Sequence, residues 1–237
     1  MNDLTARSAV SLRDSIANGE ISSVEVVSAF LAVIDEKEPA IGAWAFIDRE
    51  HALAQAKSLD DYRAAGGPLG PLHGLPVGLK DIVDTRDMPT ENGTIIDAGR
   101  RPGKDAAIVT KLRQAGAVIL GKTTTTELAY YQPTQTKNPH NPAHTPGGSS
   151  AGSAAAVGAG MAPLAVGTQT GGSVIRPSSF CDIVGFKPSH GLVPRTGVVT
   201  QAFELDTIGA MARSVADAGL LADALQGYDP GDAATNV

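Results

Sequence analysis

The feature that most constrains this chain is an uncharged stretch: residues 138–175 contain no Asp, Glu, Lys or Arg over 38 consecutive positions. At the chain's charged fraction of 19%, about seven charged residues would be expected in a segment of this length. A long surface segment normally carries some charge, so we expect this one to be largely buried or to line a site that excludes fixed charge.

The uncharged stretch is not simply apolar, because it holds two runs rich in glycine and hydroxyl groups. Residues 147–153 have the sequence GGSSAGS, and residues 167–173 have the sequence GTQTGGS. A buried hydroxyl without a partner costs about 1–3 kcal/mol. We therefore expect a polar network in which serine hydroxyls bond to backbone amides.

The second run follows an apolar strand predicted over 164–166 and then turns sharply. Paired glycines permit positive φ and close approach of a ligand, and successive N–H groups can form an anion nest. Ser173 ends this run and can act as a nucleophile, with the preceding amides stabilising an oxyanion. The alternative is an ordinary strand-to-helix turn that uses glycine and serine for its geometry.

The first run opens an alanine-rich helix predicted over 151–160. A helix N-terminus offers free N–H groups and a partial positive charge. The alternative is that Ser149 and Ser150 merely cap this helix. The residues alone do not distinguish Ser149 from Ser150 as a functional group.

A serine nucleophile needs a base, and Lys80 is the candidate. None of the histidines lies in a hydrolase or zinc-binding pattern, so no triad histidine and no metal site are predicted. Lys80 follows apolar residues 77–79 in a predicted strand, where burial disfavours the ammonium and leaves an amine that can accept a proton. The alternatives are an ion pair with Asp81, or an edge lysine whose ammonium reaches solvent.

Helical and strand patterns alternate along the chain, which predicts an α/β layer fold with partly parallel strands. With no repeat or linker, we expect one domain over residues 1–237. Ser22 and Glu25 form a capping box, and Ser214 caps the last helix. Helices are predicted over 5–18, 49–65 and 105–115, and strands over 43–47, 75–83 and 117–120.

Composition argues against several classes of protein. The net charge of −6 disfavours binding to nucleic acid or to an anionic membrane. No apolar run is long enough for a transmembrane helix, and residues 1–7 lack the apolar segment of a secretory signal. The single cysteine, Cys181, fits a reducing cytosol and is interpreted as a core residue, so a cytoplasmic protein is expected.

Residues 116–123, GAVILGKT, formally match a phosphate-binding P-loop. A P-loop needs a flexible loop between its glycines, whereas this segment has four apolar residues typical of a buried strand. Nucleotide binding is therefore disfavoured, and no cofactor is predicted.

Together these motifs resemble the amidase signature family. Three runs carry the likeness in order: GLPVGLKD at 74–81, GGSSAGS at 147–153 and GTQTGGS at 167–173, with 24 residues from Ser149 to Ser173. The resemblance extends over residues 5–228. It is nearest to the malonamidase-like branch, through GTQTGGSVIRP at 167–177 and GKTTTT at 121–126.

The resemblance implies a three-layer α/β/α fold with a mixed central sheet, of which this chain would hold the N-terminal part. It also implies a Ser-cisSer-Lys triad: Ser173 as nucleophile, Ser149 as the bridging serine on a cis peptide bond, and Lys80 as base. The expected activity is hydrolysis of a small amide through an acyl-enzyme. The backbone of the preceding residues would form the oxyanion hole: Thr170, Gly171 and Gly172.

Three positions depart from the commoner family pattern. Arg176 lies three residues after Ser173 instead of two and could bind a substrate carboxylate, which suggests a half-amide or ureido compound. The alternative is a structural arginine paired with Asp182 or with backbone carbonyls. Gln169 replaces a frequent Asp, and Asp182 occupies a position where glycine is usual.

The family's full domain is longer than 237 residues, and its C-terminal half supplies further strands and pocket walls. A second interpretation is therefore a non-catalytic amidase-derived fragment or binding module without a complete substrate pocket. An incomplete sheet would expose apolar surface, which a homodimer or a partner supplying the missing half would cover.

Overall fold

A six-stranded mixed sheet organises residues 4–236, the part of the chain that the computed structural model describes. The strand order is β1-β3-β2-β4-β6-β5. The central strand β2 runs parallel to β3 and β4, while β1, β5 and β6 pair antiparallel to their neighbours. The strands are β1 Trp44–Ile47, β2 Pro76–Lys80, β3 Val118–Thr123, β4 Leu164–Gln169, β5 Val184–Phe186 and β6 Thr207–Ala212.

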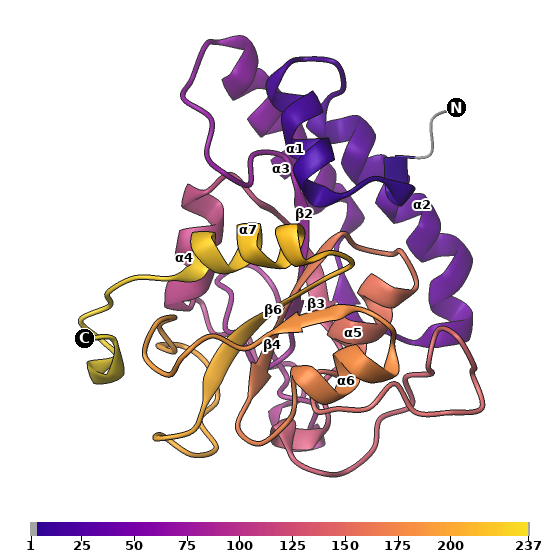
Figure 1. Cartoon of the computed structure of the whole chain (residues 1–237), viewed down its shortest axis with the longest axis vertical. Helices are drawn as coiled ribbons and strands as arrows, with labels where there is room; N and C mark the ends of the chain where they lie inside the picture. Colours follow the sequence, from indigo (N-terminus) through magenta and orange to yellow (C-terminus); the bar gives the residue numbers. More distant parts are fainter. Residues whose placement is uncertain (1–3, 237) are drawn as a thin grey trace.

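Helices separate most of these strands along the chain (Figure 1). The α-helices are α1 Ala9–Ala17, α2 Ser23–Ile41, α3 Arg49–Ala64, α4 Ala107–Gln114, α5 Ala151–Gly158, α6 Ile175–Phe180 and α7 Val215–Leu225. Short 3₁₀ helices occupy Leu4–Ala6 (η1), Ile95–Asp97 (η2), Glu127–Ala129 (η3) and Ala233–Thr235 (η4).

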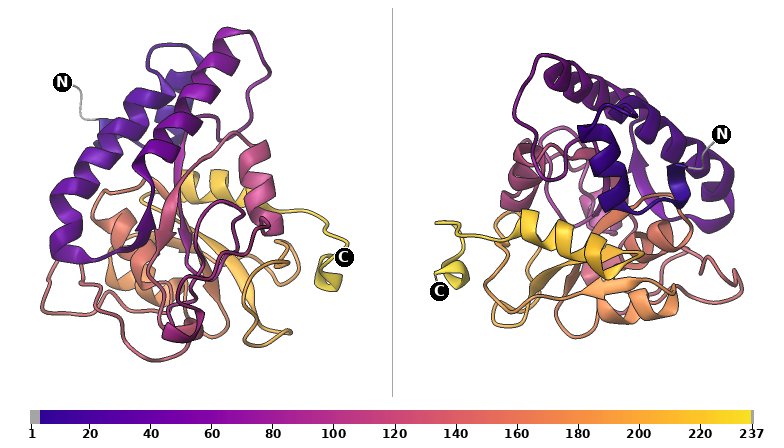
Figure 2. Two further views of the ribbon diagram at one scale, coloured as in Figure 1. Left: turned by 180° about the vertical axis from the view of Figure 1, so that it is seen from behind. Right: turned by 45° about the horizontal axis from the view of Figure 1, so that its top comes forward.

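Side chains of β4 show that helices cover both faces of the sheet. Leu164 and Val166 pack in one apolar cluster with residues of α1, α4 and α7, whereas Ala165 packs in another with α5. Because side chains alternate across a strand, these two clusters lie on opposite faces. The ribbon follows this three-layer arrangement, with α7 crossing the sheet (Figures 1 and 2). The predicted α/β/α fold with a mixed sheet is confirmed.

Local sequence signals account for most element ends. The capping box of Ser22 and Glu25 is present, and Ser214 caps α7. The predicted helix over 5–18 is shorter, because the Ser8 hydroxyl accepts a hydrogen bond from Ser11 N at 3.1 Å and α1 begins at Ala9. The strand predicted over 75–83 ends at Lys80. The N–H groups of Ile82 and Val83 both donate to the Lys80 carbonyl, which forms a turn there. Lys80 thus lies at the carboxyl end of β2.

The uncharged stretch is buried over most of its length, as predicted. Residues 146–169 are mainly buried, and seven consecutive residues of α5, from Ala151 to Val157, are buried. Residues 140–145 form an exposed loop, and Gly171 and Ile175 are also exposed. The lack of charge therefore reflects the burial of α5 between the sheet and the neighbouring segments, because charged side chains are almost never fully buried unless they are paired.

Within residues 4–236, no helix is long and apolar enough to cross a membrane. The segment interpreted as lacking a secretory signal begins with residues 1–3, which lie outside the described residues, as does residue 237. The single domain over 1–237 stays a prediction.

Candidate active site

The structure brings Lys80 and Ser149 together beside the carboxyl end of β4. The Lys80 side chain is completely buried. Its Nζ donates hydrogen bonds to Ser149 Oγ at 2.7 Å and to Thr168 Oγ1 at 2.8 Å. These partners are 69 and 88 residues away in the chain, so the sheet and the start of α5 create the contact.

Burial lowers the pKa of Lys80 to about 7, and the negative charge of Asp206 partly opposes this effect. The Asp81 carboxylate instead accepts from Glu91 N, and no ion pair joins it to Lys80 within residues 4–236. Both structural alternatives for Lys80, the ion pair and the solvent-reaching edge lysine, are therefore wrong. A lysine with a pKa near neutrality can lose its proton and accept one from a neighbouring hydroxyl.

The two adjacent serines have different partners. The peptide bond between Gly148 and Ser149 is cis, the geometry that the family resemblance implies for the bridging serine. Ser150 instead donates from Oγ to the Thr168 carbonyl and accepts from the Thr168 N–H, both at 3.2 Å. Ser150 is the N-cap residue of α5 but makes no side-chain capping bond. The capping interpretation is therefore wrong for Ser150, and only Ser149 meets Lys80.

The expected polar network is present around these residues. Ser153 Oγ donates to the Val166 carbonyl at 2.9 Å and bonds to Thr123 Oγ1 at 2.6 Å. Serine hydroxyls from α5 and the preceding loop thus bond to the backbone of β4, as predicted. The two bonds between Ser150 and Thr168 join the two glycine-rich runs of the sequence.

The side chain of Gln169 holds the turn that carries Ser173. Its Oε1 accepts from Val174 N at 2.9 Å and Ile175 N at 3.0 Å, while its Nε2 donates to the Gly171 carbonyl at 3.1 Å. A peptide's N–H points opposite to its C=O, so holding the Gly171 carbonyl also fixes the direction of the Gly172 N–H. An Asp at this position could accept both N–H bonds but could not donate to Gly171.

Ser173 is nearly buried and lines a cavity of about 310 Å³ together with Thr170, Gly171 and Gly172. Within residues 4–236, the N–H groups of Gly171, Gly172 and Ser173 have no hydrogen-bond partner. The segment that carries Ser149 and Ser150 contacts Ser173 through a backbone hydrogen bond, in which Ser150 N donates to the Ser173 carbonyl at 3.3 Å. No hydrogen bond joins Ser173 Oγ to Ser149 Oγ in this described part of the chain.

Arg176 opens onto the same cavity but also has a structural partner. Its Nε and Nη2 donate to the Gly148 carbonyl at 3.1 and 2.6 Å, while the side chain remains exposed. This is the backbone-carbonyl alternative, and residues 4–236 contain no Arg176–Asp182 ion pair. Asp182 has a φ of 52°, a left-handed conformation that explains why glycine suits this position.

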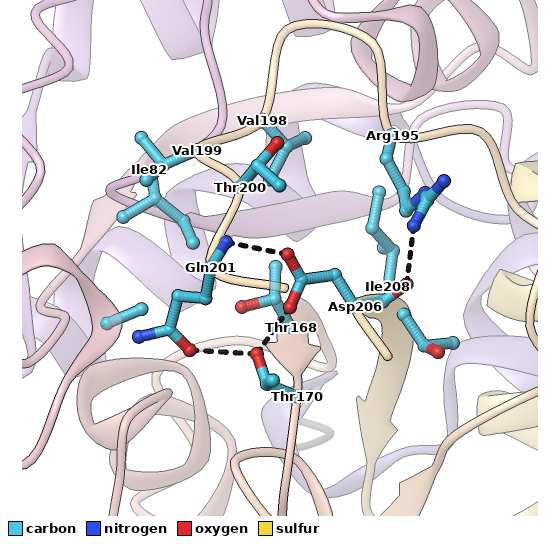
Figure 3. Close-up of a pocket in the computed structure, with 12 residues that line it drawn as sticks. Ile82, Thr168, Thr170, Arg195, Val198, Val199, Thr200, Gln201, Asp206 and Ile208 are labelled. Carbon is cyan, nitrogen blue, oxygen red and sulfur yellow. Dashed lines mark hydrogen bonds between the residues drawn. The ribbon is translucent and has the colours of Figure 1, made fainter. Parts of the chain in front are cut away.

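A second, smaller cavity of about 20 Å³ lies beside Lys80 and contains residues that the sequence motifs do not single out (Figure 3). Thr168, which contacts Lys80, lines it together with Asp206 and Gln201. Thr168 lies inside the GTQTGGS run and could have been found there. Asp206 belongs to no motif and reaches the site only through strand pairing.

Two other sequence expectations are confirmed by the structure. The apolar part of the P-loop-like segment is strand β3, so these residues form no flexible phosphate-binding loop. Cys181 is buried, and burial raises the pKa of its thiol to about 12, as fits a core residue.

Comparison with known proteins places this geometry in a family. A family model described as Amidase matches residues 25–237. A glutamyl-tRNA(Gln) amidotransferase subunit from Acidothermus cellulolyticus is 47% identical over 98% of this chain, and its counterpart from Chloroflexus aurantiacus is 41% identical over 98%. These matches cover 47% and 49% of the two relatives, so the chain spans about half their length.

Solved structures agree with this assignment. A native peptide amidase from Stenotrophomonas maltophilia superimposes with a TM-score of 0.90 at 38% identity, over 96% of this chain and 49% of the other. A chain from a vestigial protein complex, described in connection with the origins of an s-triazine catabolic enzyme, superimposes with a TM-score of 0.93 at 36% identity, over 98% and 52%.

Proposed function

Because this chain belongs to the amidase family, we propose that it hydrolyses the C–N bond of a small amide through an acyl-enzyme on Ser173. The observation that carries the proposal is the buried contact between Lys80 Nζ and Ser149 Oγ at 2.7 Å. A lysine whose pKa lies near 7, bonded to a serine hydroxyl beside a second serine in a cavity, is suited to activate a nucleophile.

The proposed reaction begins with the neutral amine of Lys80. It accepts the proton of Ser149 Oγ, which in turn takes the proton of Ser173 Oγ as that oxygen attacks the substrate carbonyl carbon. The backbone N–H groups of residues 170–173, which include Thr170, Gly171 and Gly172, stabilise the oxyanion. The proton then passes to the leaving nitrogen, the C–N bond breaks, and an ester remains on Ser173. Water hydrolyses this ester with the same base.

The relay requires Ser173 Oγ to reach Ser149 Oγ. In the proposed reaction, rotation of the Ser173 side chain about χ1 provides this movement. Catalytic hydrogen bonds are commonly longer or misaligned before substrate binds and tighten in the complex. The backbone bond from Ser150 N to the Ser173 carbonyl keeps the two segments adjacent while this rotation occurs.

Arg176 supports a substrate that carries a carboxylate, such as a half-amide or a ureido acid. Its exposed guanidinium lines the cavity that contains Ser173 and can form charge-assisted hydrogen bonds. The name of the amidotransferase relatives favours a primary amide, whose leaving group is ammonia. Nothing in this reaction requires a metal or an organic cofactor.

Replacing Arg176 with alanine should raise KM for carboxylated amides by about 10–100-fold more than for neutral amides of similar size. The neutral amide serves as the internal control, because Arg176 also bonds to the Gly148 carbonyl and its loss perturbs both substrates through the backbone. Steady-state kinetics on matched pairs measures the difference. Equal changes in KM for the two substrates would contradict the proposal that Arg176 binds a substrate carboxylate.

The proposed function is tested by fluorophosphonate labelling, followed by mass spectrometry of the labelled peptide. We expect labelling of the folded protein at Ser173 and none after heat denaturation. A parallel screen of small amides, half-amides and ureido compounds for ammonia release identifies the substrate class. A well-folded protein with neither labelling nor ammonia release contradicts the proposal.

That contrary result would favour the second candidate, a non-catalytic module or a half-site completed by another polypeptide. The chain spans about half the length of its relatives. Phe186 on the edge strand β5 and Phe180 at the end of α6 are both exposed, which suits coverage by a partner or a second copy. Labelling that appears only when a longer form or a partner is present would support this candidate.

A further inference from the structure

Asp206 lies opposite the turn that precedes Ser173. In the antiparallel pair of β4 and β6, Gln169 pairs with Thr207 and Thr168 pairs with Ile208. Continuing this register by one residue places Thr170 opposite Asp206. Sheet pairing therefore delivers a carboxylate to the start of the nucleophile turn, although the two residues are 36 positions apart.

The Asp206 carboxylate connects this turn to a separate loop. One oxygen, Oδ2, accepts from Gln201 N at 2.7 Å and Ala202 N at 3.0 Å, and Oδ1 accepts from Thr170 Oγ1. Figure 3 shows the carboxylate between Gln201 and Thr170. The Thr170 hydroxyl also lies 2.8 Å from Gln201 Oε1, so its single proton is shared between two acceptors.

The same carboxylate lies near the base. Asp206 and Thr168 line the small cavity of Figure 3, and Lys80 Nζ donates to Thr168 Oγ1 at 2.8 Å. The negative charge of Asp206 raises the pKa of Lys80, in opposition to burial. A charge that favours the ammonium stabilises the state that the base reaches after it has accepted a proton.

On the premise of the proposed function, we propose that Asp206 is a positioning residue of the site. It holds the turn before Ser173 against the loop at Gln201, and it stabilises the Lys80 ammonium that forms when Ser149 loses its proton. The proton moves from Ser149 Oγ to Lys80 Nζ, and Asp206 neither gains nor loses one. Its role is to hold and stabilise groups that react, without touching the substrate.

The effects of other charged groups near Lys80 need to be distinguished from the effect of Asp206. On the adjoining segments, burial raises the pKa of Asp81 to about 6 and lowers that of Lys122 to about 8. Across the cavity, Arg195 pairs with Asp232 at 2.7 Å and also donates to the Asp206 carbonyl. Arg176 lines the cavity that contains Ser173 and is bonded to the Gly148 carbonyl. Because burial shifts the pKa values of Asp81 and Lys122 toward neutrality, the test has to observe the protonation of Lys80 itself.

Asp206→Asn removes the charge while preserving the hydrogen bonds. The asparagine Oδ1 can accept from the N–H groups of Gln201 and Ala202, and its Nδ2 can donate to Thr170 Oγ1. The threonine proton is then free to bond to Gln201 Oε1. Asp232→Asn is the matched control, because it removes a carboxylate that pairs with Arg195, which lines the same cavity, and that makes no hydrogen bond to Lys80, Thr168 or Asp206 in the described part of the chain.

The test is NMR titration of protein labelled with ¹³C and ¹⁵N in lysine, with the Lys80 signal assigned by its loss in Lys80→Met. We expect the pH at the midpoint of the Lys80 titration to fall by about one unit in Asp206→Asn, because a charge that favours the ammonium is lost. The same midpoint should stay unchanged in Asp232→Asn. An unchanged midpoint in Asp206→Asn overturns the proposal. If the Asn variant does not fold, Asp206→Ser removes the same charge and is read in the same way.

Kinetics provides a second readout. In Asp206→Asn, the acid limb of the kcat profile should move to lower pH by the same amount as the NMR midpoint, with kcat reduced and KM little changed. A merely structural role would lower activity by one factor at every pH and leave the limb in place. If the wild type hydrolyses no amide, the proposed function fails, whereas the NMR titration still decides whether Asp206 stabilises the Lys80 ammonium.

Discussion

Replacing Lys80 with methionine is expected to lower kcat for amide hydrolysis by about 10²–10⁴-fold. Methionine fills a similar volume but cannot accept the proton of Ser149, to which Lys80 Nζ is bonded at 2.7 Å. Both formation and hydrolysis of the acyl-enzyme lose their base. Single-turnover and steady-state kinetics, with fluorophosphonate labelling rates, measure the loss.

The sign of the pH dependence follows from the same residue. Burial lowers the pKa of Lys80 to about 7, so the fraction of neutral amine increases as the pH rises through that value. Wild-type activity should therefore rise between about pH 6 and pH 8 and then level off. A profile that is flat over this range would contradict the assignment of Lys80 as the base.

Lys122→Met is the matched control for Lys80→Met. Lys122 is equally buried and lies on the neighbouring strand β3, where its Nζ donates to the Val83 carbonyl at 2.6 Å. Its loss is expected to lower stability, because a buried carbonyl loses its partner, while the labelling rate of the folded protein stays near that of wild type. Equal loss of labelling in both variants would show that Lys80 and Lys122 affect labelling only through the stability of the folded protein.

Replacing Ser173 with alanine is expected to abolish fluorophosphonate labelling and to lower kcat by about 10⁴-fold or more. The substitution removes one buried oxygen and leaves intact the bonds through which Gln169 holds the turn. Folding should therefore be preserved, as circular dichroism and thermal unfolding can verify. Retained labelling would place the nucleophile elsewhere.

Two comparisons sharpen the Ser173 result. Ser179→Ala removes an exposed serine from the same helix, α6, and should leave labelling and kcat unchanged. The double variant Lys80→Met/Ser173→Ala should be about as inactive as Ser173→Ala alone, because residues that act as one unit give non-additive losses. Additive losses would mean that Lys80 and Ser173 act independently.

The element pattern was predictable from local signals, because caps and hydrophobic spacing involve residues a few positions apart. The Ser22–Glu25 capping box and the Ser214 cap lie where the sequence predicts. The exact start of α1 was missed, because Ser8 offers a cap that competes with the extension of the helix toward Thr5. The end of β2 at Lys80 was also missed, since a turn is set by backbone bonds that apolar composition does not reveal.

The sequence by itself determined the types of chemical group: a lysine in an apolar strand, two glycine-rich runs with serines, and an uncharged segment that had to be buried. Only the tertiary structure decided which groups meet. It placed Ser149 against Lys80 and bonded Ser150 to Thr168, turned Arg176 onto the Gly148 carbonyl, and brought Asp206 across from Thr170. The physical reason is that these contacts join residues from 18 to 69 positions apart. Strand register and helix packing set such contacts, and no local pattern encodes them.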